Sequence, residues 1–345
     1  MSNRVDIWVE SAGLGHVTRQ VNLMAHLCER DVMAMDVRFL IDDNPATRAV
    51  VEGAGHAHAI RDADDATAFQ ALFNEWKHSP PALFILDSVA MDKNPNASLA
   101  LTHPAVTSVV FIDDPGDRDV ECGLLVNALP SLDAPVQKLK ARRALRGVEY
   151  LVLAREYSKG MTATRTFASC ASGFAFFGGA DLEDFTSVFL DALAAGAHVE
   201  RWSLLLGPSY KHVDSVSERI DRDDLPVTVI RHVESMAEAL RNADIAVLGS
   251  GNTLSEAAAV GTPAIVLSQN FVQAENAKFF ATRSGIIDLG MLAPDSAPRL
   301  ADAIASLSKD TRRREGMSEQ MMKTVDGKGG KRIARLLAET LTGRQ

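Results

Sequence analysis

Short apolar runs alternate with helical or polar segments along the whole chain, and this alternation limits the possible folds more than any other feature. In the first half the candidate strands are residues 7–9, 37–41, 83–86, 108–112 and 124–126. In the second half they are residues 174–177, 202–206, 227–230, 245–248 and 264–267. Strands that alternate with helices are typical of doubly wound, mostly parallel sheets. We therefore predict an α/β protein with two doubly wound, Rossmann-like domains.

The length of the chain and its local composition suggest where these domains begin and end. With 345 residues, the chain is long enough to form two domains, each with a sizeable hydrophobic core. We predict an N-terminal domain at 1–158, a Thr-, Ser- and Ala-rich linker at 159–171 and a C-terminal domain at 172–330. Residues 331–345 are expected to form a helix that can pack back on the N-terminal domain. The basic segment 137–146 is predicted to be helical.

Composition and charge exclude several classes of protein. Hydrophobic residues at 46% and charged residues at 23% are typical of a soluble globular protein. The net charge of −9 argues against a general surface for nucleic acid or acidic membranes. The longest apolar stretches fall short of a membrane span, and the N-terminus has no signal-peptide apolar core. The three separated cysteines, Cys28, Cys122 and Cys170, fit reduced thiols. We expect a cytoplasmic protein without stable membrane insertion.

The run Gly13-Leu14-Gly15-His16 joins the first predicted strand to a predicted helix. Its glycines allow a ligand to approach the backbone, and open α/β sheets bind ligands at this end of a strand. A histidine there can take a proton from water or a hydroxyl near neutral pH. The alternative is a tight turn in which His16 merely caps the helix. This run alone supports the two interpretations equally.

A second glycine run, at 249–253, also follows an apolar strand and opens a helix. Exposed backbone N–H groups and the positive end of the helix dipole make such a turn an anion site suited to a pyrophosphate. Glu256 is expected in the first helical turn, where its carboxylate can accept hydrogen bonds from ribose hydroxyls. The alternative is an ordinary connection between strands with Glu256 as a capping residue.

A third glycine turn, Gly178-Gly179-Ala180-Asp181, opens the second half, with Asp181 near the N-cap of the next helix. One face of that helix is predicted to carry Leu182, Phe185, Phe189 and Leu193. Two such domains facing each other across a cleft describe the GT-B architecture of nucleotide-sugar enzymes. In that architecture one domain usually holds the nucleotide and the other presents the catalytic group.

Short motifs in a consistent order make the resemblance more specific. They are Gly13 to Arg19, residues 111–114, 125–127, 150–157, 178–181 and 250–263, Gln273 with 275–277, and 325–329. Together they resemble the UDP-2,4-diacetamido-2,4,6-trideoxy-β-L-altropyranose hydrolase family of pseudaminic-acid biosynthesis, a relative of the peptidoglycan N-acetylglucosaminyltransferase. The resemblance implies that water attacks the anomeric carbon with inversion and that UDP is released. It also implies a role in modifying flagellin or a surface glycan. An inverting glycosyltransferase with a UDP-sugar donor is the alternative.

The resemblance assigns roles to individual residues. It makes His16 the general base and places uracil on the backbone of 233–236. The residues expected to bind the sugar substrate are Gly13, Gly15, Arg19, Asp114, Arg155, Gly179 and Asp181. The residues expected to bind the nucleotide are Ser250, Gly251, Asn252, Thr253, Glu256, Gln273 and Asn276. The expected partner is a UDP-sugar, with no nucleic acid, and the oligomeric state stays open.

No cofactor or metal is expected, because the acidic residues show no tight ligand cluster. The positive charge for UDP would come from helix ends with Arg155 or Lys211. The chain also departs from the resembled family in two places. The loop at 8–12 is shorter and lacks an Arg-x-Asp pair, and Ser88 and Val89 follow Asp87 where the family tends to carry a tyrosine. Both departures lie on the expected sugar side.

Overall fold

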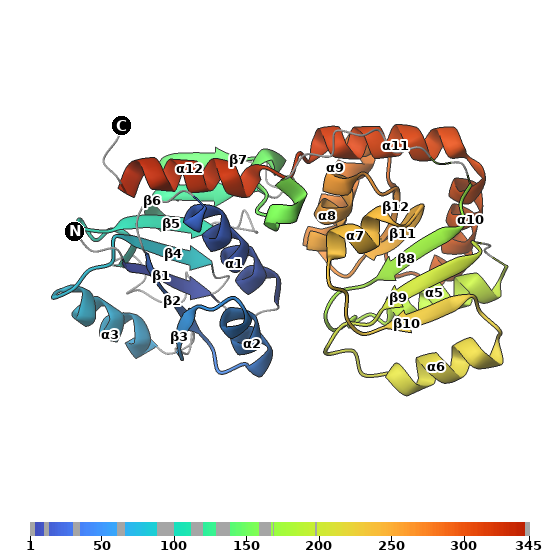
Figure 1. The fold of residues 1–345 in the computed structure, drawn as a ribbon, viewed down its shortest axis with the longest axis horizontal. Coiled ribbons are helices and arrows are strands. Elements are labelled where there is room, and N and C mark those ends of the chain that lie inside the picture. Colours follow the sequence, from blue (N-terminus) through green and yellow to red (C-terminus); the bar gives the residue numbers. More distant parts are fainter. Residues whose placement is uncertain are drawn as a thin grey trace. The chain divides into compact units, whose positions relative to one another are not determined.

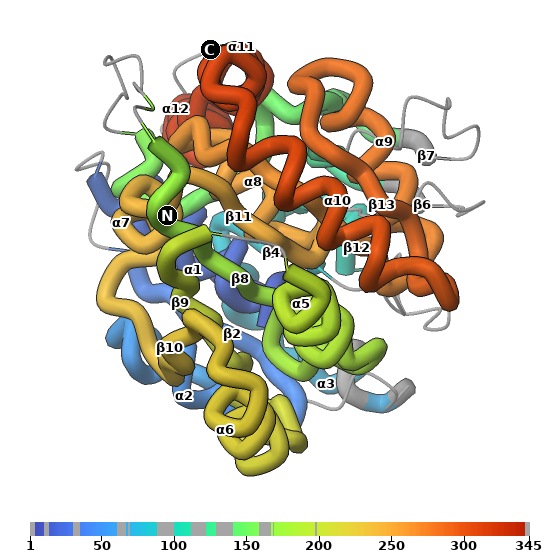
Figure 2. Tube along the Cα trace, turned by 90° about the vertical axis from the view of Figure 1, so that its right-hand side faces the viewer, coloured from blue at the N-terminus to red at the C-terminus, as the bar shows by residue number. Residues whose placement is uncertain are grey.

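The computed structural model divides the chain into two compact units. It describes residues 4–9, 14–29, 35–60, 66–87, 100–111, 120–128, 139–158, 167, 169–196 and 199–341. Unit 1 comprises Met1–Ser158 and Gly327–Gln345, and unit 2 comprises Lys159–Asp326. Figures 1 and 2 show that each unit is an α/β layer structure. Most of the predicted linker lies outside the described residues.

Unit 1 is built on a seven-stranded sheet in the order β3-β2-β1-β4-β5-β6-β7, with every neighbouring pair parallel. Its strands are β1 (Arg4–Val9), β2 (Asp36–Ile41), β3 (Ala57–Ile60), β4 (Leu83–Asp87), β5 (Thr107–Phe111), β6 (Val120–Asn127) and β7 (Leu139–Arg146). Its helices are α1 (Leu14–Cys28), α2 (Pro45–Gly53), α3 (Ala66–Trp76) and α12 (Gly329–Leu341), with short 3-10 turns η3 (Val148–Tyr150) and η4 (Arg155–Ser158).

The two faces of this sheet bury different apolar sets, because successive strand residues point to opposite sides. Ile7 and Val9 of β1 join the core that α1 and α12 cover, whereas Trp8 joins the core on the other face with Trp76 of α3. Helix α12, from the far end of the chain, packs along α1 (Figure 1). Gly330 permits this packing, since a Cβ there would lie 2.2 Å from Cδ2 of the buried His26 ring.

Unit 2 repeats the arrangement with a six-stranded parallel sheet in the order β10-β9-β8-β11-β12-β13. Its strands are β8 (Ser172–Phe176), β9 (Arg201–Leu205), β10 (Val227–Ile230), β11 (Ile245–Gly249), β12 (Ala264–Ser268) and β13 (Ile287–Met291). Its helices are α5 (Phe185–Ala194), α6 (Val213–Arg222), α7 (Met236–Arg241), α8 (Asn252–Val260), α9 (Phe271–Ser284), α10 (Ser296–Lys309) and α11 (Thr311–Thr324). Strands β11 and β12 are buried along their whole length, as a sheet covered on both faces requires.

The predicted fold class, two parallel α/β domains, is confirmed, but two local predictions are wrong. The segment predicted as a basic helix is the edge strand β7, which pairs with β6. Arginine is a good helix former, but pairing with the sheet overrides that preference, and an edge strand tolerates exposed charges such as Arg142 and Arg143. Leu182 lies before α5, with 81% of its surface exposed, instead of on the helix face. The sequence analysis also missed β3 and β13.

Within the described part of the chain, no helix combines the length and apolar character needed to cross a membrane.

Candidate functional site

In unit 1 the strand order reverses between β1 and β4, which are neighbours in the sheet although β2 and β3 lie between them in sequence. Ligands of open α/β sheets bind at such a switch point, outside the carboxyl ends of the strands. Helix α1 follows β1 and brings His16 to this edge as its third residue. Asp87 is the last residue of β4, beside Val9 of β1. The topology therefore places an imidazole and a carboxylate together.

His16 and Asp87 form a direct hydrogen bond between Nδ1 and Oδ1, at 2.7 Å. A carboxylate only accepts hydrogen bonds, so the imidazole carries its proton on Nδ1 and donates it. The opposite ring nitrogen, Nε2, is then the unprotonated one. The Asp87 side chain is 1% exposed, whereas that of His16 is 18% exposed. The pair consists of a buried orienting carboxylate and a partly accessible base.

Two more side chains of α1 hold the Asp87 carboxylate. Arg19 donates from Nε to Oδ2 at 2.9 Å and from Nη2 to Oδ1 at 2.5 Å. Gln20 donates from Nε2 to Oδ2 at 2.6 Å. Burial raises the pKa of Asp87, but the positive charge of Arg19 and the contact with His16 outweigh burial and hold that pKa well below its usual value. Asp87 therefore stays ionised near neutral pH.

Arg19, which was predicted to bind substrate, contacts Asp87 and the Phe111 ring in unit 1. Besides its two bonds to Asp87, its guanidinium lies 5.4 Å from the centroid of the Phe111 ring, a cation–π distance. Its Nη2 lies 3.1 Å from His16 Nδ1. With the imidazole proton on Nδ1, both groups are donors, so Arg19 fixes the pair through its bonds to the Asp87 carboxylate.

The other predicted sugar-binding residues of unit 1 do not all gather around His16. Gly15 is the second residue of α1 and adjoins it. Arg155 instead pairs with Glu29 at 3.1 Å, just beyond the far end of α1. Since an α-helix rises 1.5 Å per residue, Glu29 lies about 20 Å along the helix axis from His16. Gly13 and Asp114 lie outside the described residues.

In unit 2 the strand order reverses between β8 and β11, and two of the predicted glycine turns follow these strands. Gly207 allows the turn after β8 to pack closely, since a Cβ there would lie 2.3 Å from the carbonyl oxygens of Gly178 and Gly179. A Cβ on Gly179 itself would meet no atom within 4 Å. The turn is thus packed on one side and has open space beside Gly179.

The turn after β11 leaves the amino end of α8 without a side-chain cap. Its N-cap residue is Gly251, and a Cβ there would approach only Gln273 Nε2, at 3.8 Å. Side chains do cap the helices α5, α7, α9 and α11 of the same unit. The amides of Asn252 and Thr253 in the first turn of α8 therefore have no side-chain acceptor and are placed to bind an anion.

Gln273 is oriented toward this turn by its own hydrogen bond. Its Oε1 accepts from the backbone N–H of Gln269 at 3.0 Å, which leaves the NH₂ group near Gly251. Gln269 in turn donates to the carbonyl of Phe177 at the end of β8. The two loops of the switch point are thereby connected, with an amide donor beside the uncapped helix.

Ser250 and Asn276 support this turn from beneath. The Ser250 side chain is fully buried and bonds to Ser268 Oγ at 2.7 Å, while its backbone N–H donates to Leu267. Asn276 donates from Nδ2 to the carbonyl of Ser250 at 3.0 Å. Both were predicted to bind nucleotide, and the structure places them beneath the turn, where each makes a hydrogen bond that supports it.

Two acidic residues lie differently from the sequence-based expectation. Glu256 is the fifth residue of α8, half-buried, instead of lying in its first turn. Asp181 accepts from the backbone N–H groups of Phe185 and Thr186, at 2.9 Å each, and so caps α5. Its burial raises the pKa of its carboxyl. The expectation that Asp181 lies near an N-cap holds, but both its oxygens are engaged within the protein.

The described residues contain no group of three or more His, Cys, Asp or Glu side chains arranged to hold a metal ion. Asp87 is the functional residue that sequence reasoning missed. The available signal was its place directly after an apolar strand, at the carboxyl edge where His16 was already expected.

Comparison with known proteins assigns the fold. Residues 176–334 match the model of the glycosyltransferase family 28 C-terminal domain. The chain is 26% identical over 204 residues to the spore coat polysaccharide biosynthesis protein SpsG of Bacillus subtilis, covering 57% of this chain and 58% of that protein. It is 22% identical over 274 residues to an uncharacterised protein, MJ1062, of Methanocaldococcus jannaschii, covering 76% of this chain and 54% of the relative. The chain thus spans little more than half the length of these relatives.

Solved structures extend the likeness over both units. MurG of Acinetobacter baumannii superposes with a TM-score of 0.70 at 13% identity, covering 97% of this chain and 99% of that one. HepE of Anabaena, solved with UDP and glucose, gives a TM-score of 0.61 at 12% identity, covering 97% of this chain and 99% of that one. The chain therefore has a GT-B fold, and its residues 176–334 are similar to the family 28 C-terminal domain.

Proposed function

We propose that the chain is an inverting glycosyltransferase that takes its sugar from a UDP-sugar donor. The observation that carries the proposal is the His16–Asp87 pair at the switch point of unit 1. A partly accessible imidazole that carries its proton on Nδ1 is the general base that such a reaction needs to activate a hydroxyl. The family 28 match in unit 2 and the uncapped turn before α8 support a nucleotide-sugar as the donor.

Unit 2 binds the nucleotide in this proposal. The diphosphate accepts hydrogen bonds from the amides of Asn252 and Thr253, and the dipole of α8 stabilises its charge. Gly251 allows the phosphates to approach the backbone, and Gln273 donates from its NH₂ group. Glu256, one turn further along α8, accepts from the ribose hydroxyls.

The chemical step exchanges one C–O bond for another at the anomeric carbon. The acceptor oxygen attacks that carbon from the face opposite UDP, and its proton passes to His16 Nε2. The bond between the anomeric carbon and the diphosphate oxygen breaks, and UDP leaves with the electron pair. Asp87 stabilises the imidazolium that forms, as the carboxylate of a Ser-His-Asp triad does. The configuration of the sugar is inverted.

Hydrolysis is the second candidate, with water as the acceptor. The ordered motifs that resemble the UDP-sugar hydrolase family of pseudaminic-acid biosynthesis favour it, and His16 would activate water in the same way. The relative named for spore coat polysaccharide biosynthesis supports a role in a surface glycan for either reaction. The two candidates differ only in the acceptor.

A UDP-release assay with a panel of UDP-sugars tests the proposal. We expect UDP to appear faster when sugar, lipid or protein acceptors are added, and His16→Ala to lower turnover by roughly 10²–10⁴-fold. Full UDP release in buffer alone, unchanged by any acceptor, would assign the hydrolase. Undiminished turnover of the His16 variant would remove this residue from the mechanism.

Calorimetry tests the nucleotide site separately. Glu256→Ala keeps a good helix former in α8 and should weaken UDP binding by roughly 1.5–3 kcal/mol, the value of a hydrogen bond to a charged group. Gly251→Val should weaken it more, because the side chain occupies the space that the phosphates need. If both folded variants bind UDP as tightly as the parent protein, the nucleotide lies elsewhere.

A further inference from the structure

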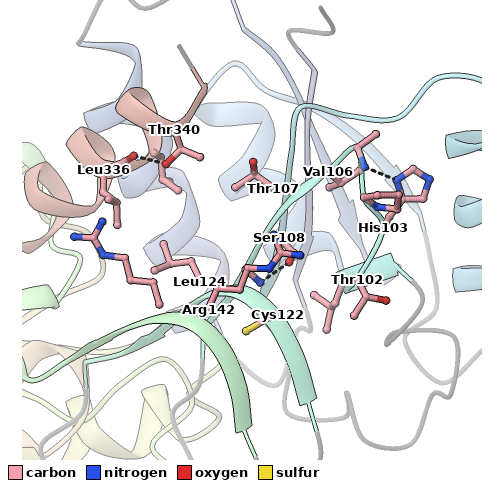
Figure 3. A pocket seen from close by; sticks show the side chains of 16 residues that line it. Thr102, His103, Val106, Thr107, Ser108, Cys122, Leu124, Arg142, Leu336 and Thr340 are labelled. Atoms are coloured by element: carbon pink, nitrogen blue, oxygen red, sulfur yellow. Dashed lines mark hydrogen bonds between the residues drawn. The ribbon is translucent and has the colours of Figure 1, made fainter. Parts of the chain in front are cut away.

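Unit 1 contains a cavity of about 520 Å³ at the edge of the sheet opposite to His16. It lies at the amino ends of β5 and β6, beside the edge strand β7 and the last turns of α12. Figure 3 shows Leu336 and Thr340 of α12 on one side, Thr102 and His103 on the other, and Arg142 with Ser108 between them. Because β1 and β4 present His16 and Asp87 at the carboxyl edge, the cavity is separate from that site.

Among the residues that the structure describes, the lining of this cavity has a positive charge and no negative one. Arg142 and Arg143 both line it, and none of its 16 lining residues is Asp or Glu. Neighbouring strand residues point to opposite faces, so the cavity reaches both sides of β7. Neither arginine makes an ion pair with the part of the chain that the structure describes. This concentration of positive charge contrasts with the net charge of −9 of the whole chain.

Hydroxyl groups and apolar side chains complete the lining. Thr107 and Thr340 bring hydroxyls, and Leu336 and Leu124 bring apolar surface. The Ser108 hydroxyl accepts from the backbone N–H of Gly123 at 2.8 Å, which fixes the side chain at the bottom of the cavity. A volume of this size is typical of sites for small molecules, which combine apolar walls with a few polar groups.

We propose that this cavity is a second ligand site, for a small phosphorylated metabolite. Guanidinium groups bind phosphate through paired N–H donors, and the cavity has one such group on each side of β7. The hydroxyls of Thr107 and Thr340 then bind the polar remainder of the ligand. The site lies at the amino edge of the sheet of unit 1, away from the carboxyl edge that carries His16 and Asp87. It is independent of the nucleotide assignment in unit 2.

Calorimetry with glycerol 3-phosphate as the probe tests this proposal on the full chain. UDP is present in excess, to fill phosphate-binding positions in unit 2, and glycerol serves as the neutral control. We expect glycerol 3-phosphate to bind and glycerol not to bind. The double substitution R142A/R143A should weaken binding by about tenfold or more, as expected when hydrogen bonds to a charged group are lost.

Two further variants separate the cavity from general charge effects. Arg146→Ala removes an exposed arginine from the same strand but outside the cavity, and should leave binding unchanged. Thr340→Glu leaves both arginines in place but adds a negative charge to the lining, and should weaken binding. The proposal is overturned if the probe does not bind, if glycerol binds equally well, or if R142A/R143A binds as the parent does. Equal losses in R146A and R142A/R143A would also overturn it.

Discussion

Among single residues, Asp87 acts in the proposed mechanism only through its hydrogen bond to His16. Its carboxylate fixes the tautomer of the imidazole and stabilises its protonated form. We therefore expect Asp87→Asn to lower turnover by about 10²–10⁴-fold, since the amide can donate to Nδ1 and favour the wrong tautomer. UDP affinity should stay unchanged, because the nucleotide is assigned to unit 2. Steady-state kinetics and calorimetry measure both.

Asp6→Asn is the matched control for this variant. Asp6 is also a fully buried carboxylate in unit 1, and it accepts from Arg38 and from Trp76 Nε1. Loss of its charge should lower the stability of unit 1 without altering His16. If both asparagine variants lose turnover to the same extent after correction for folded protein, Asp87 has no positioning role.

The Asp87 carboxylate also makes stability depend on pH. Its pKa is held below the ordinary carboxyl value, because Arg19 and His16 outweigh the effect of burial. A carboxyl group whose pKa is lower in the folded state stabilises the fold fully above its unfolded-state pKa of about 4. This stabilisation is lost as the pH falls toward the folded-state pKa. Urea unfolding should therefore show the parent more stable than Asp87→Asn at pH 7, with the gap narrowing below about pH 4. A constant gap across this range contradicts the assignment.

The sequence predicted the position of His16 but not its partner Asp87. His16 was predictable because its glycines, its strand and its helix are adjacent in the chain. Asp87 lies 71 residues away, and only the pairing of β4 with β1 brings its carboxylate to the imidazole. The position of Ser250 and Asn276 at the turn was predictable, but their hydrogen bonds were not, since the direction of a side chain depends on packing that the sequence does not display.

At the scale of elements, helix α8 is left uncapped where a ligand is assigned. Gly251→Asp tests this directly, because the N-cap position has φ −84° and ψ −151°, which any residue adopts, and space for a Cβ. The new carboxylate should cap α8 and stabilise the fold by about 0.5–1 kcal/mol. It should also exclude the diphosphate and weaken UDP binding by about 100-fold or more. Unfolding and calorimetry should thus change in opposite directions, and tighter UDP binding contradicts the site.

The strand β7 explains why one element was mistaken. Its sequence, Leu-Lys-Ala-Arg-Arg-Ala-Leu-Arg, consists of good helix formers and has no alternating pattern. Its identity as a strand comes from β6, with which it pairs residue by residue from Val120 to Asn127. Buried strands such as β11 and β12 were predictable from their apolar runs alone. Strands β3 and β13, also at sheet edges, were missed, whereas the edge strand β10 was predicted from its run Val-Thr-Val-Ile.

In the molecule as a whole, unit 1 is built from two separate segments of the chain. The chain leaves unit 1 after Ser158, builds unit 2, and returns at Gly327 so that α12 covers α1. The two-domain alternation was readable from the sequence, because each half has its own series of strands. The return point is less visible, since it depends on the close fit of Gly329 against Leu151 and of Gly330 against His26.

Hydrogen exchange followed by mass spectrometry can test this division, with Gly330→Ala and Gly316→Ala as a matched pair. Both glycines lie in helices, but a Cβ on Gly330 would collide with the buried His26 ring, whereas one on Gly316 meets no atom within 4 Å. Gly330→Ala should destabilise unit 1 by about 1–3 kcal/mol and speed exchange in α1 and α12. Gly316→Ala, in unit 2, should be neutral or stabilise by about 0.5–1 kcal/mol.

The same measurement with UDP completes the test. UDP should slow exchange at the start of α8 and in the turn that precedes it, and leave α12 unchanged, in the parent and in both variants. Gly330→Ala should not alter UDP affinity, because the residues assigned to the nucleotide all lie in unit 2. Faster exchange in α8 of the Gly330 variant would mean that the packing of α12 affects unit 2. UDP protection confined to α1 and α12 would mean that the nucleotide binds to unit 1.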